Sequence, residues 1–140
     1  PLYIPVGTFV TSYARNVTIR AAQKCYDRFI YADTDSIHVT KYCNPHIEIH
    51  PTKLGAWKKE FVFSRGKYLH SKCYIELGHD PEKDEEDKLK ITVAGMPPGC
   101  YSQVTFDTFK YGQEFSGKLV TKRVSGGIVL LPTTYKIKIK

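Results

Sequence analysis

The sequence predicts an α+β fold, in which one helix precedes a series of short antiparallel strands. Apolar side chains that recur every four residues predict a helix over 5–27 with a single apolar stripe. Two short apolar segments, 28–32 and 36–40, flank an acidic turn at 33–35, and this pattern predicts a β-hairpin. Residues 96–99, with two prolines and a glycine, break the pattern and predict a boundary between two parts of the chain.

The rest of the chain is expected to be rich in short strands. They are expected at 61–63, 67–70, 72–77, 90–94, 118–124, 128–131 and 134–139. The glycine pair before 128–131 supplies the positive φ of a tight hairpin turn. Two short helical pieces are expected at 54–59 and 105–111, while the stretch 79–88 is too charged to join a core.

The charge distribution favours a polyanionic partner. The 140 residues carry a formal net charge of +7, and seven of the 14 acidic residues lie within 76–88. The rest of the chain is therefore strongly basic, which is typical of proteins that bind nucleic acid. Charge alone also leaves open the alternative that this is a basic protein with no polyanionic partner.

No apolar run approaches the roughly 18 residues that a membrane span needs, and no signal peptide is recognised. The chain starts in mid-pattern without a methionine, so we expect a fragment of a longer protein.

The cysteines indicate a reducing environment. There are four, far apart in the sequence: Cys25, Cys43, Cys73 and Cys100. Because they form no C-x-x-C pair, a disulfide framework is not expected and the cytoplasm is the expected location. Cys43, His46 and His50 have a spacing that faintly resembles a metal site. Only three ligands fall there, so a solvated loop is favoured over a structural zinc.

The strongest chemical signal is the turn at 31–36, with the sequence Y-A-D-T-D-S. Two metal ions about 3.5–4 Å apart can hold the attacking and leaving oxygens of a phosphoryl displacement. Mg²⁺ prefers oxygen ligands, typically one or two carboxylates together with substrate phosphates. Asp33 and Asp35 at the end of a hairpin supply such carboxylates, although both need not be ligands. Asp and Ser are also favoured in ordinary polar turns. Considered without the rest of the sequence, residues 31–36 could therefore be such a turn.

Residues 31–36 resemble the Y-x-D-T-D-S motif of family B DNA polymerases. Residues 18–27 (T-I-R-A-A-Q-K-C-Y-D) resemble the preceding helix in the protein-primed branch found in small tailed bacteriophages. Residues 72–74 (K-C-Y) resemble that family's K-x-Y motif, and 104–130 resemble its thumb. Two shorter segments also resemble family landmarks, 53–57 and 93–96. Gly66 stands where the family pattern leads us to expect alanine.

The resemblance implies a parent protein that is a DNA-directed DNA polymerase. An antiparallel palm sheet with a packed helix and a catalytic β-hairpin would occupy 1–98, and a small β-rich thumb would occupy 99–140. The implied partners are primer-template DNA, deoxynucleoside triphosphates, a priming terminal protein and the remaining domains of the polymerase. The second palm carboxylate motif, the fingers motif and the exonuclease domain have no counterpart here. The isolated fragment is therefore expected to be inactive.

The resemblance also implies roles for single residues. Asp35 would be the main ligand of the catalytic ions, and Asp33 would be the partner of Asp35. The ions would be Mg²⁺, with Mn²⁺ as a possible substitute. The resemblance assigns two further pairs of residues, of which Tyr31 and Ser36 would shape the site, while Lys72 and Tyr74 would contact the primer strand. Four basic residues are expected to follow the DNA backbone, namely Lys122, Arg123, Lys136 and Lys138. For the strand that ends the chain, lysines that protect a sheet edge are the alternative.

Two other functions stay open from the residues. A reverse transcriptase-like palm also carries paired acids at a hairpin end, but D-T-D-S differs from the adjacent aspartates of that class. A non-catalytic basic domain could bind nucleic acid with no active site at all. A second carboxylate motif and a fingers lysine elsewhere in the parent protein would distinguish a polymerase from both.

Overall fold

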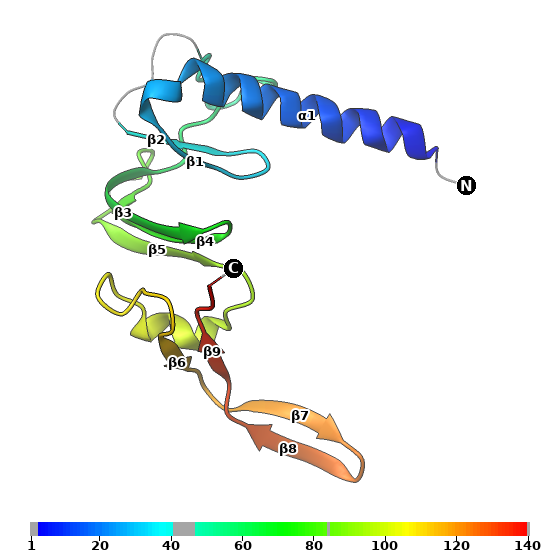
Figure 1. Ribbon diagram of the computed structural model, residues 1–140, viewed down its shortest axis with the longest axis vertical. Coiled ribbons are helices and arrows are strands. Elements are labelled where there is room, and N and C mark those ends of the chain that lie inside the picture. The colour runs from blue at the N-terminus through cyan, green and yellow to red at the C-terminus, as the bar shows by residue number, and fades with distance from the viewer. Residues whose placement is uncertain (1–2, 41–46, 84, 140) are drawn as a thin grey trace. The chain divides into compact units, whose positions relative to one another are not determined.

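The computed structural model describes residues 3–40, 47–83 and 85–139. The chain folds into two compact units, Pro1–Lys59 and Glu60–Lys140 (Figure 1). Taken together, the described residues form an α+β fold in which every sheet is antiparallel, as the sequence predicts. The boundary between palm and thumb after residue 98 stays a prediction.

The first unit contains one long helix and a two-stranded hairpin. Helix α1 spans Ile4–Lys24 and is followed by the short 3₁₀-helix η1, Tyr26–Arg28. Strands β1 (Phe29–Ala32) and β2 (Ile37–Val39) pair antiparallel, and α1 packs against both (Figure 1). Periodicity and turn chemistry are local signals, and here they predicted the order and type of the elements correctly.

The apolar stripe of α1 is buried only toward its C-terminal end. Ala21 and Cys25 are 5% and 0% exposed, whereas Phe9 and Tyr13 are 75% and 76% exposed. Tertiary packing rather than intrinsic propensity stabilises most helices in proteins. The packing that holds α1 in this structure is therefore concentrated in its last turns, next to the hairpin.

The second unit contains a three-stranded sheet in the order β3-β4-β5. Its strands are β3 (Val62–His70), β4 (Cys73–His79) and β5 (Lys88–Val93). The two short strands expected at 61–63 and 67–70 are thus one strand. The pairing of β3 with β4 is irregular between Phe63 and Arg65. An extra residue can be absorbed as a bulge without ending a strand, which explains why the polar residues there do not interrupt it.

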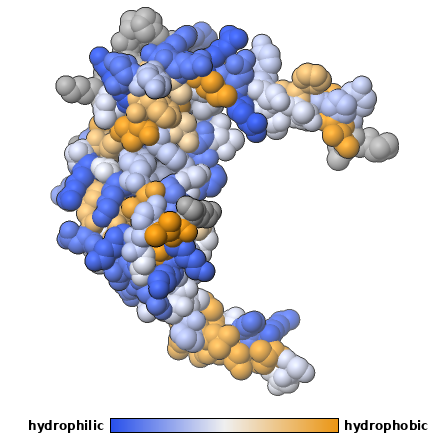
Figure 2. All heavy atoms as spheres, viewed as in Figure 1, coloured by the Kyte–Doolittle hydropathy of each residue, from blue (hydrophilic) through white to orange (hydrophobic). Residues whose placement is uncertain are grey.

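The remaining elements are short. They are η2 (Pro98–Gln103), β6 (Glu114–Ser116), β7 (Val120–Val124), β8 (Gly127–Leu131) and β9 (Thr134–Lys136). Strand β6 pairs with β9 and β7 pairs with β8, so the hairpin expected around the glycine pair is confirmed. Apolar side chains gather over the β7–β8 hairpin (Figure 2), where every strand residue is exposed.

Neither of the two short helical pieces predicted from sequence is present. Residues 105–111 form turns, because the hydroxyls of Thr105 and Thr108 accept hydrogen bonds from backbone N–H groups of each other. Such side-chain bonds compete with the helical pattern. Residues 54–59 also form a turn, with Gly55 at φ 83° and Trp57 in an isolated bridge with Ile49.

One apolar cluster holds the second unit together. Its buried members are Cys73, Ile75, Val93, Met96, Cys100, Val104, Phe109, Phe115 and Ile137. Two tyrosine hydroxyls reinforce the packing, since Tyr135 donates to the Ala94 carbonyl and Tyr111 to the Leu69 carbonyl. The sheet therefore shares one core with η2, β6 and the segment around β9, whereas the β7–β8 hairpin does not contribute to it.

The cysteines differ from the expectation in one respect. Cys73 and Cys100 are free and buried. Cys25 is disulfide-bonded, which the expectation of no disulfide framework did not anticipate.

Candidate active-site hairpin

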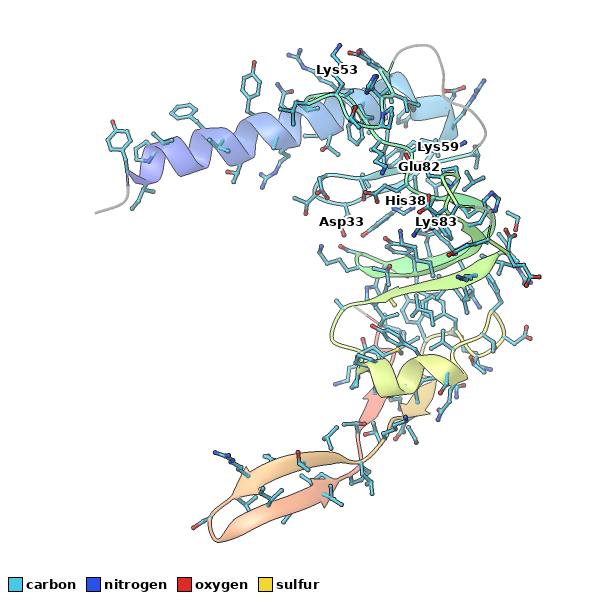
Figure 3. All side chains as sticks on the ribbon, turned by 180° about the vertical axis from the view of Figure 1, so that it is seen from behind. Asp33, His38, Lys53, Lys59, Glu82 and Lys83 are labelled. Atoms are coloured by element: carbon cyan, nitrogen blue, oxygen red, sulfur yellow. The ribbon has the colours of Figure 1, made fainter. Side chains whose placement is uncertain are left out.

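The acidic motif lies at the end of the β1–β2 hairpin, where Figure 3 labels Asp33. The Asp33 N–H donates to the Ser36 carbonyl over 3.0 Å and closes the turn. The Asp33 Oδ1 accepts from the backbone N–H of Thr34 over 2.7 Å and from its hydroxyl over 3.2 Å. Asp33 therefore shapes the turn with its carboxylate, as aspartates in such turns commonly do.

Helix α1 holds the turn from a second side. The Thr18 hydroxyl donates to the Thr34 carbonyl over 3.1 Å, and Thr18 is only 8% exposed. A threonine lowers helix propensity slightly, so the sequence marks Thr18 only as a weak helix residue. Its bond to a backbone carbonyl sixteen positions away leaves no pattern in the sequence, and sequence reasoning missed it.

The two aspartates have different surroundings. Asp35 is exposed, whereas Asp33 is half-buried and hydrogen-bonded within the turn. Tyr31 is half-buried at the start of the turn and lies against His38 across the hairpin, with ring centroids 5.3 Å apart at 66°. Cross-strand aromatic pairs of this kind stabilise a hairpin and fix ring orientation. The structure thus brings Tyr31, Asp33, Asp35 and Ser36 together at one end of the hairpin.

The carboxylates of the turn suit a hard cation, but they supply only part of the ligands that such a cation needs. Both acids offer oxygen ligands, which Mg²⁺ and Mn²⁺ prefer over nitrogen or sulfur. Mg²⁺ takes six ligands and usually binds one or two carboxylates plus water and phosphate. Within the described residues no group of three or more His, Cys, Asp or Glu side chains gathers as a metal cluster.

An open hollow of about 670 Å³ lies between α1 and β1 beside the turn. Its lining includes Ala14, Ile19, Ala22 and Phe29, with Arg15 as a cation. Phosphate sites are lined by backbone N–H groups and several cations. This largely apolar lining is more typical of a packing surface than of a phosphate site.

The K-x-Y residues lie together in the second unit, at the start of β4. Lys72 is exposed in the turn between β3 and β4, at φ 54°, and its carbonyl accepts from Ala94 N–H over 2.8 Å. A positive φ is uncommon for a residue with a side chain. Tyr74 is only 6% exposed and its ring stacks on Tyr68, with centroids 5.3 Å apart at 21°. Lys72 is thus presented by an unusual turn, and Tyr74 is held within the sheet face.

The four predicted backbone-binding residues are all exposed. Lys122 and Arg123 are consecutive in β7, so their side chains point to opposite faces of that hairpin. Lys136 and Lys138 alternate with the partly buried Tyr135 and the buried Ile137. Strand β9 ends at Lys136 and is shorter than the strand expected at 134–139.

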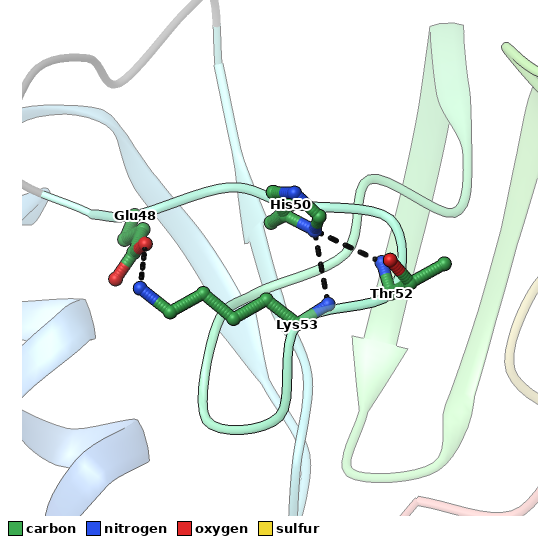
Figure 4. Close-up of polar contacts among 4 residues, drawn as sticks. All are labelled: Glu48, His50, Thr52 and Lys53. Atoms are coloured by element: carbon green, nitrogen blue, oxygen red, sulfur yellow. Dashed lines mark hydrogen bonds and ion pairs between the residues drawn. The ribbon is translucent and has the colours of Figure 1, made fainter.

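The weak metal spacing between β2 and β3 has no support from His50. Cys43 and His46 lie outside the described residues. The Nδ1 of His50 accepts from the backbone N–H groups of Thr52 and Lys53, at 3.2 and 2.9 Å (Figure 4). The Lys53 ammonium donates to Glu48, and this hydrogen bond lowers the pKa of the Glu48 carboxyl below its usual value. His50 is therefore part of a local loop structure.

The chain matches known proteins over almost its full length. No family model matches it. It is 41% identical to a DNA polymerase of Bacillus phage B103 and 42% identical to that of Bacillus phage phi29, over 99% of this chain in each case. It is also 41% identical to a DNA polymerase of Streptococcus phage Cp-1, again over 99% of this chain. The chain spans 24–27% of the length of these relatives.

Solved structures give the same result. The chain superposes on phi29 DNA polymerase complexed with primer-template DNA and incoming nucleotides, with a TM-score of 0.87 and 42% identity. The binary complex with primer-template DNA gives a TM-score of 0.84 and 40% identity. The match covers 99% of this chain and 26–27% of those chains. This chain therefore belongs among the phi29-type DNA polymerases, the protein-primed family B polymerases that its sequence resembles.

Proposed function

We propose that this chain is part of a DNA-directed DNA polymerase and supplies one carboxylate motif of its two-metal nucleotidyl-transfer site. The observation that carries the proposal is the Asp33–Ser36 turn, closed by its own backbone and held by Thr18. The reaction is attack of a primer 3′ hydroxyl on the α-phosphate of a deoxynucleoside triphosphate. A new phosphodiester bond forms, and the bond to pyrophosphate breaks.

In this reaction the two acids act differently. The exposed Asp35 would be the main metal ligand, and Asp33, which shapes the turn, would contribute a second carboxylate. Mg²⁺ or Mn²⁺ bound there would stabilise the charge that develops on the reacting oxygens. Tyr31 and Ser36 border the same turn and shape the space for the primer end and nucleotide.

Lys72 and Tyr74 are proposed to contact the primer strand near its end. A lysine acts on a phosphate as a compact charge, and tyrosine offers a ring face and a hydroxyl. The exposed basic residues of the predicted thumb, Lys122, Arg123, Lys136 and Lys138, would follow the backbone without reading bases. The palm would occupy 1–98 and the thumb 99–140.

The family adds proposals about the whole protein. The family resemblance leads us to propose initiation from the hydroxyl of a terminal protein. The phage origin of the relatives supports a proposed location in the cytoplasm of a bacterial host. No helix within the described ranges is long and apolar enough to cross a membrane. The relatives are named DNA polymerases, which does not favour a reverse transcriptase or a non-catalytic basic domain.

The isolated 140-residue chain is expected not to extend a primer, because one carboxylate motif does not complete the metal site. Incubation with primer-template, deoxynucleotides and Mg²⁺ or Mn²⁺ should give no product above a matched preparation of the Asp35→Asn chain. The complete polymerase should give templated product under the same conditions. Extension by the isolated chain that Asp35→Asn abolishes would show that the site within it is complete.

Lys72→Ala in the complete polymerase is expected to weaken primer-template binding by roughly 1–3 kcal/mol, typical of a charged hydrogen bond. The single-turnover rate at saturating DNA should stay near wild type, because Lys72 does not belong to the metal-binding turn. Lys83→Ala is the matched control, since Lys83 is an exposed lysine paired with Asp80 in the acidic loop. Equal DNA affinity in both variants would remove Lys72 from the primer site.

A further inference from the structure

We propose that Glu76 and Tyr68 are positioning residues, which hold the ring of Tyr74 in the orientation that contacts the primer strand. The proposal deepens the proposed function and rests on the primer-binding role of Tyr74. Neither residue belongs to the K-x-Y motif.

Three side chains meet on one face of the β3–β4 sheet. Tyr74 and Glu76 are two residues apart in β4 and so project to the same face. Tyr68 pairs with Tyr74 across the strands, and their rings are stacked. The Tyr68 hydroxyl donates to Glu76 Oε1. Tyr68 therefore contacts both β4 residues, because its ring stacks on Tyr74 and its hydroxyl donates to Glu76.

Glu76 is an unusual residue for this position. It is 1% exposed and lies between Ile75 and Leu77 in the central strand of the sheet. A buried carboxylate is unfavourable unless it is hydrogen-bonded, and a leucine of similar size would pack there without that cost. The hydrogen bond from Tyr68 therefore points to orientation of a neighbouring group as the function of this carboxylate.

Gly66 provides the space that the Tyr68 ring occupies. Gly66 pairs with Glu76 across the strands. A Cβ at Gly66 would lie 2.9 Å from Cε2 of Tyr68 and 3.5 Å from its hydroxyl oxygen. The ring thus lies over the glycine, where its hydroxyl reaches Glu76. A methyl group at this position would contact the ring, so Gly66 favours the ring position that the structure shows.

The test uses the complete polymerase and three variants that keep the size of the side chain. Tyr68→Phe removes the donor, Glu76→Leu removes the acceptor, and Glu76→Gln keeps an acceptor at the same place. Tyr68→Phe and Glu76→Leu should each weaken primer-template affinity about 3- to 10-fold, the scale of losing one typical net hydrogen bond. Glu76→Gln should rescue most of that affinity. The KM for deoxynucleotide should not change in any of the three.

A double-mutant cycle separates positioning from general destabilisation. Tyr68→Phe and Glu76→Leu remove the same interaction. The double variant should therefore have the same DNA affinity as whichever single variant binds DNA less tightly. Additive losses would overturn the proposal, as would unchanged affinity in Tyr68→Phe or no rescue by Glu76→Gln.

Tyr74→Ala in the same assay tests the underlying role separately. If Tyr74→Ala loses DNA affinity while Tyr68→Phe and Glu76→Leu do not, only the positioning role fails. If Tyr74→Ala keeps wild-type affinity, the primer-binding role of Tyr74 fails and the positioning role with it.

Discussion

Asp35→Asn in the complete polymerase is expected to lower kcat by about 100-fold or more, the scale of removing one preorganised electrostatic group. The substitution keeps the shape of the side chain and removes the charge. A metal ligand stabilises charge that develops in the transition state, so the loss should appear in the chemical step. Primer-template affinity should stay close to wild type. Single-turnover incorporation and DNA binding, measured on the same preparation, check both parts.

Two further aspartates make this experiment specific. Asp107→Asn is the matched control, because Asp107 is an exposed acid in the turn after η2 and has no proposed role. Asp33→Asn keeps the Oδ1 that accepts from Thr34, so it should preserve the turn. It should therefore cost activity only through the lost charge. Near wild-type incorporation by Asp35→Asn would mean that Y-A-D-T-D-S is only a turn, and the proposed function would be wrong.

The parts of the fold that sequence predicted well are those with local causes. The helix over 5–27 follows from a spacing of four, and the hairpin follows from two apolar segments around an acidic turn. The glycine pair predicted the β7–β8 turn, where Gly126 and Gly127 have φ of 95° and 156°. In each case the residues that determine the element are those within it.

The parts that sequence missed depend on distant or competing contacts. The threonines at 105 and 108 bond to each other's backbone and replace the expected helix. Thr18 holds the acidic turn through a carbonyl, and Glu76 meets Tyr68 through strand register. Composition and periodicity do not encode such pairs, because the partner is chosen by the folded sheet.

The family resemblance indicated which residues to expect at the site, but not how each is held. It selected Asp33 and Asp35 together. The structure distinguishes the acid that shapes the turn from the exposed one. It likewise selected Lys72 and Tyr74 as a pair, although one is exposed in a turn and the other is buried in a stack. The two members of each pair therefore need separate substitutions to test their roles.

The same sheet should be sensitive to one methyl group at Gly78. Gly78 is buried in the central strand β4, opposite the irregular part of β3. A Cβ built on Gly78 would lie 1.9 Å from the Val62 carbonyl oxygen and 2.6 Å from the Phe63 Cα. Both atoms belong to the backbone, so no side chain can rotate away to relieve the contact.

Gly78→Ala is therefore expected to destabilise the 140-residue chain by about 3 kcal/mol, the upper range for overpacking a core. The midpoint of thermal unfolding should fall by about 10 °C, given how midpoints scale with free energy for chains of this size. Gly7→Ala is the control for the same chemical change, because a Cβ at Gly7 meets no atom within 4 Å. Alanine is favoured over glycine in helices by roughly 0.5–1 kcal/mol, so this control should be neutral or slightly more stable. If Gly78→Ala unfolds at the wild-type temperature, β3 and β4 do not approach as closely as the structure shows, and the register that brings Tyr68 to Tyr74 and Glu76 would have to be revised.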